Sequence, residues 1–154
     1  LRMALEDISS DYDWVFLDSP PSLGVLTVNA LTASREVLIP LQCETLSHRG
    51  VGQLLDTIHD VRRLLNPRLK VLGVLPTLYD SRTNHAKAVL ADIEHRYELP
   101  ILLPAIPKSV RFAEAPAVGR SIMSTSRRSK GAQAYREVAM GLLGTTAASA
   151  PTSA

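Results

Sequence analysis

Short, unbroken apolar runs alternate along the chain with longer segments in which apolar residues recur every three or four positions. The short runs cover residues 14–17, 37–41, 71–75 and 101–103, the last continuing towards Ile106. An unbroken apolar run predicts a strand that is covered on both faces, as in a parallel sheet. The longer segments predict amphipathic helices that connect the strands. This alternation favours a three-layer α/β fold with a mostly parallel sheet of about four strands.

Three helices are predicted from the longer segments. They cover residues 51–65, 86–97 and about 131–142. The first is closed by the pair Asn66–Pro67, because the residue before a proline disfavours helical backbone, and the second ends near Pro100. After Gly144 the sequence contains only Ala, Ser, Thr and Pro, so we expect residues 145–154 to form a disordered tail.

Composition narrows the class of protein. Of the 154 residues, 45% are hydrophobic and 21% are charged, which is enough apolar material for a packed core. The net charge of +2 argues against a dedicated polyanion binder, although local basic patches still matter. Cys43 is the single cysteine, so no internal disulfide can form and a reducing compartment is expected. No apolar run is long enough to cross a bilayer.

An acidic residue follows the first predicted strand. The run 14–17 ends in Asp18, and Ser19-Pro20-Pro21-Ser22 comes next. Ligands of open α/β sheets bind beyond the carboxyl ends of the strands. A carboxylate there can hold Mg²⁺ through water while the metal bridges phosphate oxygens. The prolines prevent a helix before Ser22, which we expect to cap the helix that follows. The alternative is that Asp18 merely caps a turn.

Four segments together resemble the ParA-type partitioning ATPases, the deviant Walker proteins of the MinD-like superfamily. Residues 12–23 are similar to the Walker B and switch II segment of that family. The other three are residues 40–52, residues 77–84, which resemble Thr-x-Tyr-Asp-x-Arg-Thr, and residues 106–116, which resemble Ile-Pro-Arg-x-Val-Arg-x-x-Glu-Ala-Pro. The resemblance extends from about Ile8 to Gly144. It implies that residues 1–144 are the C-terminal part of a ParA-like ATPase domain, incomplete on its N-terminal side.

The resemblance implies nucleotide-binding roles for four residues. Asp18 would assist Mg²⁺ and the attacking water in the intact enzyme. Thr77, Pro107 and Lys108 would border the adenine base, with Lys108 standing where the family more commonly has Arg. The cofactors implied are ATP and Mg²⁺. In the segment around Gln42 and Glu44, a role near the nucleotide and a plain polar loop remain equal alternatives.

The resemblance also implies that Arg82, Lys108 and Arg111 contact DNA phosphates. An arginine fork suits bidentate binding of a phosphate, and such contacts do not read sequence. For Arg82, the alternative is a solvated side chain paired with Asp80. The basic stretch at residues 120–130 is interpreted first as a solvated face, and DNA contact there is the lesser alternative.

The glycine-rich loop that such an ATPase needs is not found in these 154 residues. In the family, a Gly-Lys-Gly-Gly-x-Gly-Lys-[Ser/Thr] loop holds the phosphates, and no Lys-Ser/Thr follows Gly50-Val51-Gly52 here. The loop-bearing strand of the family lies between those that correspond to residues 14–18 and 37–41. We therefore expect a fragment with a gap in its sheet, exposed apolar flanks, and no tight ATP binding or hydrolysis by this chain alone.

The partners implied by the resemblance are nonspecific DNA, a ParB-like protein and a second copy of the intact protein, in the cytoplasm and on the nucleoid. The alternative is a truncated, non-catalytic remnant that acts at most as a DNA- or partner-binding module. A MinD-type membrane-cycling protein is disfavoured, because the segment after Gly144 lacks the basic and large apolar residues of a membrane-targeting helix.

Overall fold

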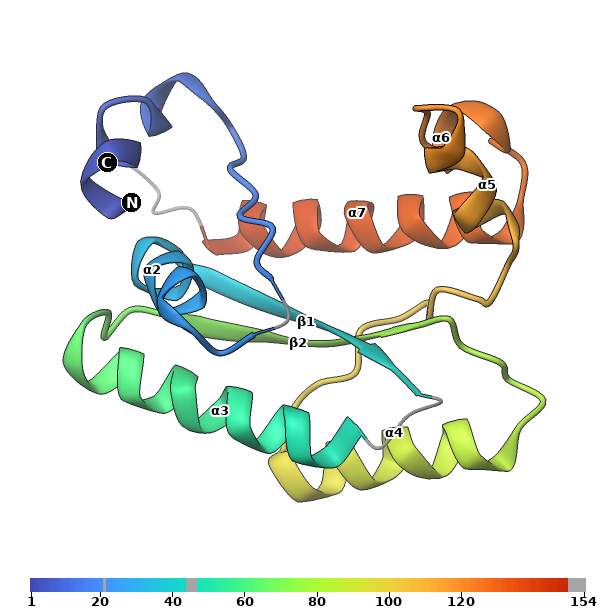
Figure 1. The fold of residues 1–154 in the computed structure, drawn as a ribbon, viewed down its shortest axis with the longest axis horizontal. Helices are drawn as coiled ribbons and strands as arrows, with labels where there is room; N and C mark the ends of the chain where they lie inside the picture. The colour runs from blue at the N-terminus through green and yellow to red at the C-terminus, as the bar shows by residue number, and fades with distance from the viewer. Residues whose placement is uncertain (21, 44–46, 150–154) are drawn as a thin grey trace. The chain divides into compact units, whose positions relative to one another are not determined.

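A computed structural model describes residues 1–20, 22–43 and 47–149 of the chain. Helices and strands alternate from the second helix to the fourth, and helices alone follow. The elements are α1 (Arg2–Glu6), the 3₁₀ helix η1 (Ser9–Asp11), α2 (Val25–Ala33), β1 (Glu36–Gln42), α3 (Ser47–Leu64), β2 (Lys70–Thr77), α4 (Asn84–Tyr97), α5 (Arg111–Ala117), α6 (Ile122–Thr125) and α7 (Lys130–Ser149), as Figure 1 shows. The α/β class predicted from the sequence is confirmed.

The chain divides into two compact units. The first unit comprises Leu1–Ile39 with Leu46–Gly73, and the second comprises Pro40–Thr45 with Val74–Ala154. The strands β1 and β2 are hydrogen-bonded parallel neighbours, and each contributes residues to both units. Each unit is described by itself below.

The predicted strand at residues 101–103 is reduced to isolated bridges beside β2. Val74 donates its N–H to the Pro100 carbonyl at 2.9 Å and accepts from Leu102 N at 2.8 Å, which forms a parallel bridge with Ile101. The prediction of a regular strand here was wrong. Pro100, Pro104 and Pro107 lack the N–H that a continuous ladder requires, so pairing is interrupted after each bridge.

The predicted strand at residues 14–17 does not form either. This segment is assigned to no strand, and Phe16 is 79% exposed while its ring stacks on Trp14 with centroids 5.8 Å apart. A strand requires a neighbour for its backbone hydrogen bonds, and the described residues place none beside it. The sheet of the described residues therefore has two strands where about four were predicted, and the expected gap stays a prediction.

The three predicted helices are confirmed as α3, α4 and α7. Thr83 caps α4 by accepting from Ala86 N, and the helix buries Ala86, Val89 and Ile93 at helical spacing. α7 continues past Gly144 to Ser149, and the division into residues 1–144 and a tail of residues 145–154 stays a prediction. Alanine-rich sequence is compatible with helix, and propagation from an existing helix avoids the cost of nucleation. Residues 150–154 lie outside the described part.

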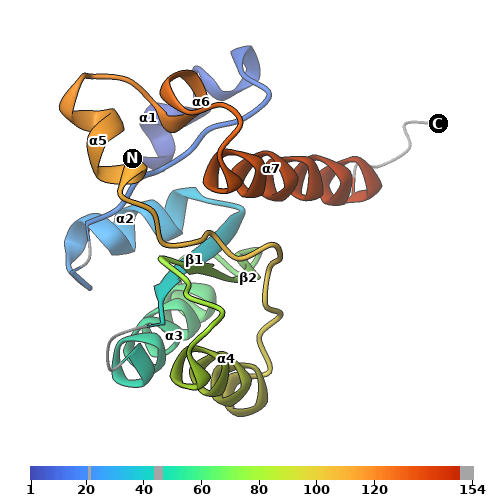
Figure 2. The same ribbon diagram turned by 90° about the vertical axis from the view of Figure 1, so that its right-hand side faces the viewer.

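Within the first unit, α2 and α3 lie on opposite sides of the paired strands in Figures 1 and 2. Asn66, just after α3, donates its side-chain amide to the carbonyls of Leu31 (2.9 Å) and Ser34 (2.6 Å) at the end of α2. Ser22 does not cap α2 as expected. The helix begins at Val25, and the Ser22 carbonyl instead accepts a hydrogen bond from Thr27 Oγ1.

Within the second unit, α4 lies on one side of the strand ends and α5, α6 and α7 lie on the other (Figures 1 and 2). A small apolar cluster joins the three C-terminal helices. It contains Ala115 of α5, Ile122 of α6 and Ala132 of α7, with the half-buried ring of Phe112 against it. This cluster fixes how the segments after α5 return towards the Pro107 loop.

Candidate functional site

The end of β2 is bonded to the loop that carries Pro107 and Lys108. Ile106 N donates to the Pro76 carbonyl at 2.8 Å, Tyr79 N to the Ile106 carbonyl at 2.9 Å, and Lys108 N to the Tyr79 carbonyl at 3.1 Å. Leu78, between them, has a φ of 48°, in the left-handed region that non-glycine residues seldom adopt. The structure thus brings Thr77 close to Pro107 and Lys108 at one edge of the second unit.

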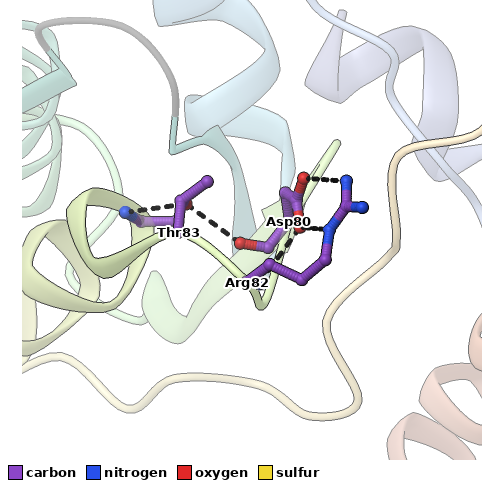
Figure 3. A network of polar contacts seen from close by, with 4 residues as sticks. Asp80, Arg82 and Thr83 are labelled. Atoms are coloured by element: carbon purple, nitrogen blue, oxygen red, sulfur yellow. Dashed lines mark hydrogen bonds and ion pairs between the residues drawn. The ribbon is translucent and has the colours of Figure 1, made fainter.

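Asp80 and Arg82 form a tight ion pair just beyond that ladder. Arg82 Nε donates to Asp80 Oδ1 at 2.9 Å and Nη2 donates to Oδ2 at 2.7 Å, a bidentate geometry that Figure 3 shows. The backbone N–H of Arg82 also donates to Oδ1 at 3.1 Å. The Arg82 side chain is 87% exposed, whereas that of Asp80 is 22% exposed. The pairing that was the alternative interpretation of Arg82 is therefore present.

The ion pair changes the acidity of the carboxyl group. Hydrogen bonds from Arg82, with a smaller contribution from the charge of Lys108, lower the pKa of Asp80 from 3.8 to about 2. The same contact raises the pKa of Arg82. Asp80 is therefore ionised under all physiological conditions, and its environment contains two cations.

A basic hollow lies beside this turn in the same unit. It is an open cavity of about 750 Å³, and its lining is cationic or hydroxyl-bearing apart from Pro107. The cations are Lys108, Arg111, Arg127, Arg128 and Lys130, and the hydroxyl groups belong to Ser109, Ser124, Thr125, Ser126 and Ser129. No acidic residue of the described chain lines it. Such a surface attracts anions, and its donors suit phosphate oxygens.

Local hydrogen bonds hold the two sides of the basic hollow. Ser109 Oγ accepts from Arg111 N at 3.3 Å at the start of α5. Ser129 Oγ accepts from Ala132 N at 3.2 Å and so caps α7. Arg136, one turn further along α7, donates Nη2 to the Arg127 carbonyl at 2.7 Å. The loop that carries Arg127 and Arg128 is thereby tied to the helix that follows it.

Sequence reasoning found only part of this surface. It named Lys108 and Arg111, which line the basic hollow together. It treated the stretch at residues 120–130 chiefly as a solvated face, and it missed the hydroxyl groups of residues 124–126. The available signal was the run Ser-Thr-Ser-Arg-Arg-Ser, in which every side chain is a potential phosphate ligand.

Asp18 lies in the first unit and is exposed. Among the described residues, no group of three or more His, Cys, Asp or Glu side chains could hold a metal ion. A single carboxylate fits the way Mg²⁺ is bound in nucleotide sites, where one or two carboxylates act together with water and phosphates. Of the neighbouring loop segments, Pro21 and Glu44 lie outside the described residues. No described helix has the length and apolarity needed to cross a membrane.

Comparisons with known proteins show which proteins the chain resembles. A family model described as an AAA domain matches residues 1–71. The chain is 42% identical over 139 residues to the sporulation initiation inhibitor protein Soj of Bacillus subtilis, and 46% identical over 139 residues to the chromosome-partitioning ATPase Soj of Thermus thermophilus. Each match covers 90% of this chain and 55% of the relative. The chain is therefore similar over most of its length to ParA/MinD-like P-loop ATPases.

Solved structures agree with this similarity. The ParA/MinD-like chain superposes with a TM-score of 0.77 on the cobyrinic acid a,c-diamide synthase of Mycobacterium smegmatis, at 54% identity over 92% of this chain and 51% of that one. Structures of that protein were solved with ADP and magnesium and with an ATP analogue and magnesium. The cell division ATPase MinD of Pyrococcus furiosus, 22% identical with a TM-score of 0.70, shares the fold. The chain spans about half the length of these relatives.

Proposed function

We propose that this ParA/MinD-like chain is the DNA-contacting part of a chromosome- or plasmid-partitioning ATPase. The observation that carries the proposal is the basic hollow, in which Lys108 and Arg111 lie with three further cations and no described acid. A surface of this kind binds the phosphate backbone without reading the bases. The names of the Soj relatives support partitioning as the process that such binding serves.

The test is the affinity of the chain for a random-sequence DNA duplex, measured by fluorescence anisotropy over a range of salt concentrations. The variant Lys108→Ala/Arg111→Ala should bind more weakly, and the slope of log affinity against log salt should fall by roughly 2, because two phosphate contacts are lost. The matched control, Arg68→Ala/Lys87→Ala, removes the same charge from exposed residues outside the basic hollow. Equal losses in both variants would refute a specific surface.

In the intact protein, ATP and Mg²⁺ are proposed to bind with Asp18 assisting the metal and with Thr77, Pro107 and Lys108 bordering the base. ATP-dependent dimerisation, stimulation by a ParB-like partner and association with the nucleoid belong to the same proposal. The 154 residues alone should show no tight, Mg²⁺-dependent binding of a fluorescent ATP analogue, because they contain no Gly-Lys loop. Submicromolar binding by this chain would contradict that expectation. A non-catalytic module that only binds DNA or a partner is the alternative.

A second candidate function is favoured by one observation, the 54% identity to cobyrinic acid a,c-diamide synthase of Mycobacterium smegmatis. Under this proposal, the intact protein converts two carboxylates of cobyrinic acid to amides. The two functions differ in their ligands. Binding of cobyrinic acid by the intact protein, with DNA affinity unchanged in Lys108→Ala/Arg111→Ala, would favour the synthase over the partitioning protein.

A further inference from the structure

The Asp80–Arg82 pair leaves one edge of the guanidinium open. Arginine carries five N–H donors on three nitrogens, and Asp80 engages Nε and Nη2. Figure 3 shows the third nitrogen of Arg82 pointing away from the carboxylate. The Arg82 side chain is 87% exposed and that of Asp80 only 22%, so the guanidinium faces solvent while the carboxylate is largely covered.

The carboxylate is held in place independently of the guanidinium contact. Asp80 Oδ1 also accepts from the backbone N–H of Arg82 at 3.1 Å. The Asp80 carbonyl accepts from Thr83 N at 3.2 Å and from Thr83 Oγ1 at 3.0 Å, and Thr83 in turn caps α4. The turn therefore fixes Asp80 against the start of a helix, and two hydrogen bonds hold the Arg82 guanidinium against Asp80.

We infer that Asp80 is a positioning residue, which holds the guanidinium of Arg82 with its outer Nη1–Nη2 edge directed at a nucleic-acid phosphate. The inference rests on the proposed function, since it concerns the same DNA. A free arginine loses rotamer freedom when it binds a phosphate, whereas a side chain that is already fixed loses less. The outer edge still offers the two parallel donors that bidentate phosphate binding requires.

The opposite role for Asp80 predicts an effect of the opposite sign. If the carboxylate competed with phosphate for Arg82, its removal would strengthen DNA binding. Loss of a negative charge near DNA also strengthens binding in general. Both effects would make a variant that lacks the Asp80 charge bind DNA more tightly. If such a variant binds more weakly, the positioning role accounts for the loss.

The experiment measures the affinity of the 154-residue chain for a random-sequence duplex by fluorescence anisotropy at low salt. The variants are Asp80→Asn, Arg82→Ala, Arg82→Lys and the double variant Asp80→Asn/Arg82→Ala. The matched control is Asp60→Asn, because Asp60 pairs with Arg63 at 3.4 Å on α3, with side chains 63% and 64% exposed. Asp60→Asn removes one negative charge, as Asp80→Asn does, and breaks an exposed ion pair on the protein surface. Circular dichroism of each variant verifies that the fold is retained.

The positioning role predicts that Asp80→Asn weakens DNA binding by roughly two- to tenfold, the cost of ordering one long side chain. The loss should vanish when Arg82 is already Ala. Asp60→Asn should bind as tightly as the wild type or slightly tighter. Arg82→Lys should also bind more weakly, because it keeps the charge but loses the fork.

Unchanged or tighter binding by Asp80→Asn, with Arg82→Ala weakened, would overturn the positioning role and leave the proposed DNA binding intact. Equal losses for Asp80→Asn in the presence and absence of Arg82 would also overturn it. A wild-type chain that does not bind the duplex at low salt would refute the proposed function, and the inference would fall with it. The outcomes therefore distinguish failure of the inference from failure of the function.

Discussion

The ring of Phe112 lies directly against the backbone of Gly131. A Cβ atom at position 131 would come within 2.6 Å of Phe112 Cζ and 2.9 Å of Cε2. The ring of Phe112 also packs against that of Tyr135, one turn further along α7, in a T-shaped arrangement with centroids 5.8 Å apart. The absence of a side chain at Gly131 thus allows the first turn of α7 to approach α5. The neighbouring residues Arg111 and Lys130 both line the basic hollow.

Gly131→Ala should destabilise the protein. The new methyl group would have to displace a ring that is fixed by Tyr135 and by the cluster of α5, α6 and α7, a form of overpacking that costs about 1–3 kcal/mol. The control is Gly141→Ala on the same helix, where a Cβ would meet nothing within 4 Å. That change should stabilise the protein by about 0.5–1 kcal/mol through helix propensity. Urea denaturation measures both, and equal effects would show that the Phe112 contact does not limit position 131.

Replacing Asn66 should loosen the joint between α2 and α3. Its amide donates to two carbonyls, so Asn66→Ala leaves both acceptors without this donor and should cost about 1–3 kcal/mol. Asn66→Asp should cost more, because it directs an anionic acceptor at two carbonyl oxygens. Denaturation midpoints of the three proteins give the order, and an Asp variant as stable as the wild type would show that the joint does not depend on these bonds.

Acid should remove the contribution of the Asp80–Arg82 pair to stability. The pKa of Asp80 falls from 3.8 to about 2 on folding, so this contribution is complete above the higher value. It is lost as pH falls from about 4 towards 2, because the carboxyl group becomes protonated in the folded state. The difference in free energy of unfolding between the wild type and Asp80→Asn should shrink over this range. A difference independent of pH between 2 and 6 would mean that the charge of Asp80 does not contribute.

Phe16 should promote self-association of the chain. Its ring is 79% exposed on a segment that forms no described helix or strand, and Val15, Val25 and Leu26 of the same unit are also exposed. Exposed apolar residues on an unpaired extended segment favour intermolecular contact. Phe16→Ser should reduce the mass measured by light scattering at high concentration. Met140→Gln, which alters an exposed residue on the regular helix α7, serves as the control and should have a smaller effect.

The sequence predicted the elements whose signals are local. The helical spacing of Val51, Ile58 and Val61 and the stop at Asn66–Pro67 were sufficient to predict α3, and the apolar runs were sufficient to predict β1 and β2. The run at residues 14–17 carries the same local signal, yet it forms no strand. Whether an apolar run becomes a strand depends on a neighbour, and periodicity contains no information about neighbours.

Residues of the candidate site that lie within one short sequence motif were predicted. Residues that only the folded chain brings beside that motif were missed. Lys108 and Arg111 belong to one short segment, so a single motif names both. Arg127 and Arg128 join them because Phe112 packs on Gly131 and brings α7 back towards α5. That contact depends on the shape of two distant residues, and neither residue type indicates phosphate binding by itself.

The bond from Arg136 to the Arg127 carbonyl has a consequence for mutational scans of this protein. Substitution of Arg136 would release the loop that presents its neighbours, and the lost affinity would imitate that of a residue that contacts the ligand. The salt dependence of DNA affinity, which reports the counterions released on binding, would separate an indirect loss from a lost phosphate contact. Arg136 bonds a backbone carbonyl and not a phosphate, so its substitution should leave that salt dependence unchanged. The number of positive side chains near a surface therefore exceeds the number of charges that the surface can offer to a polyanion.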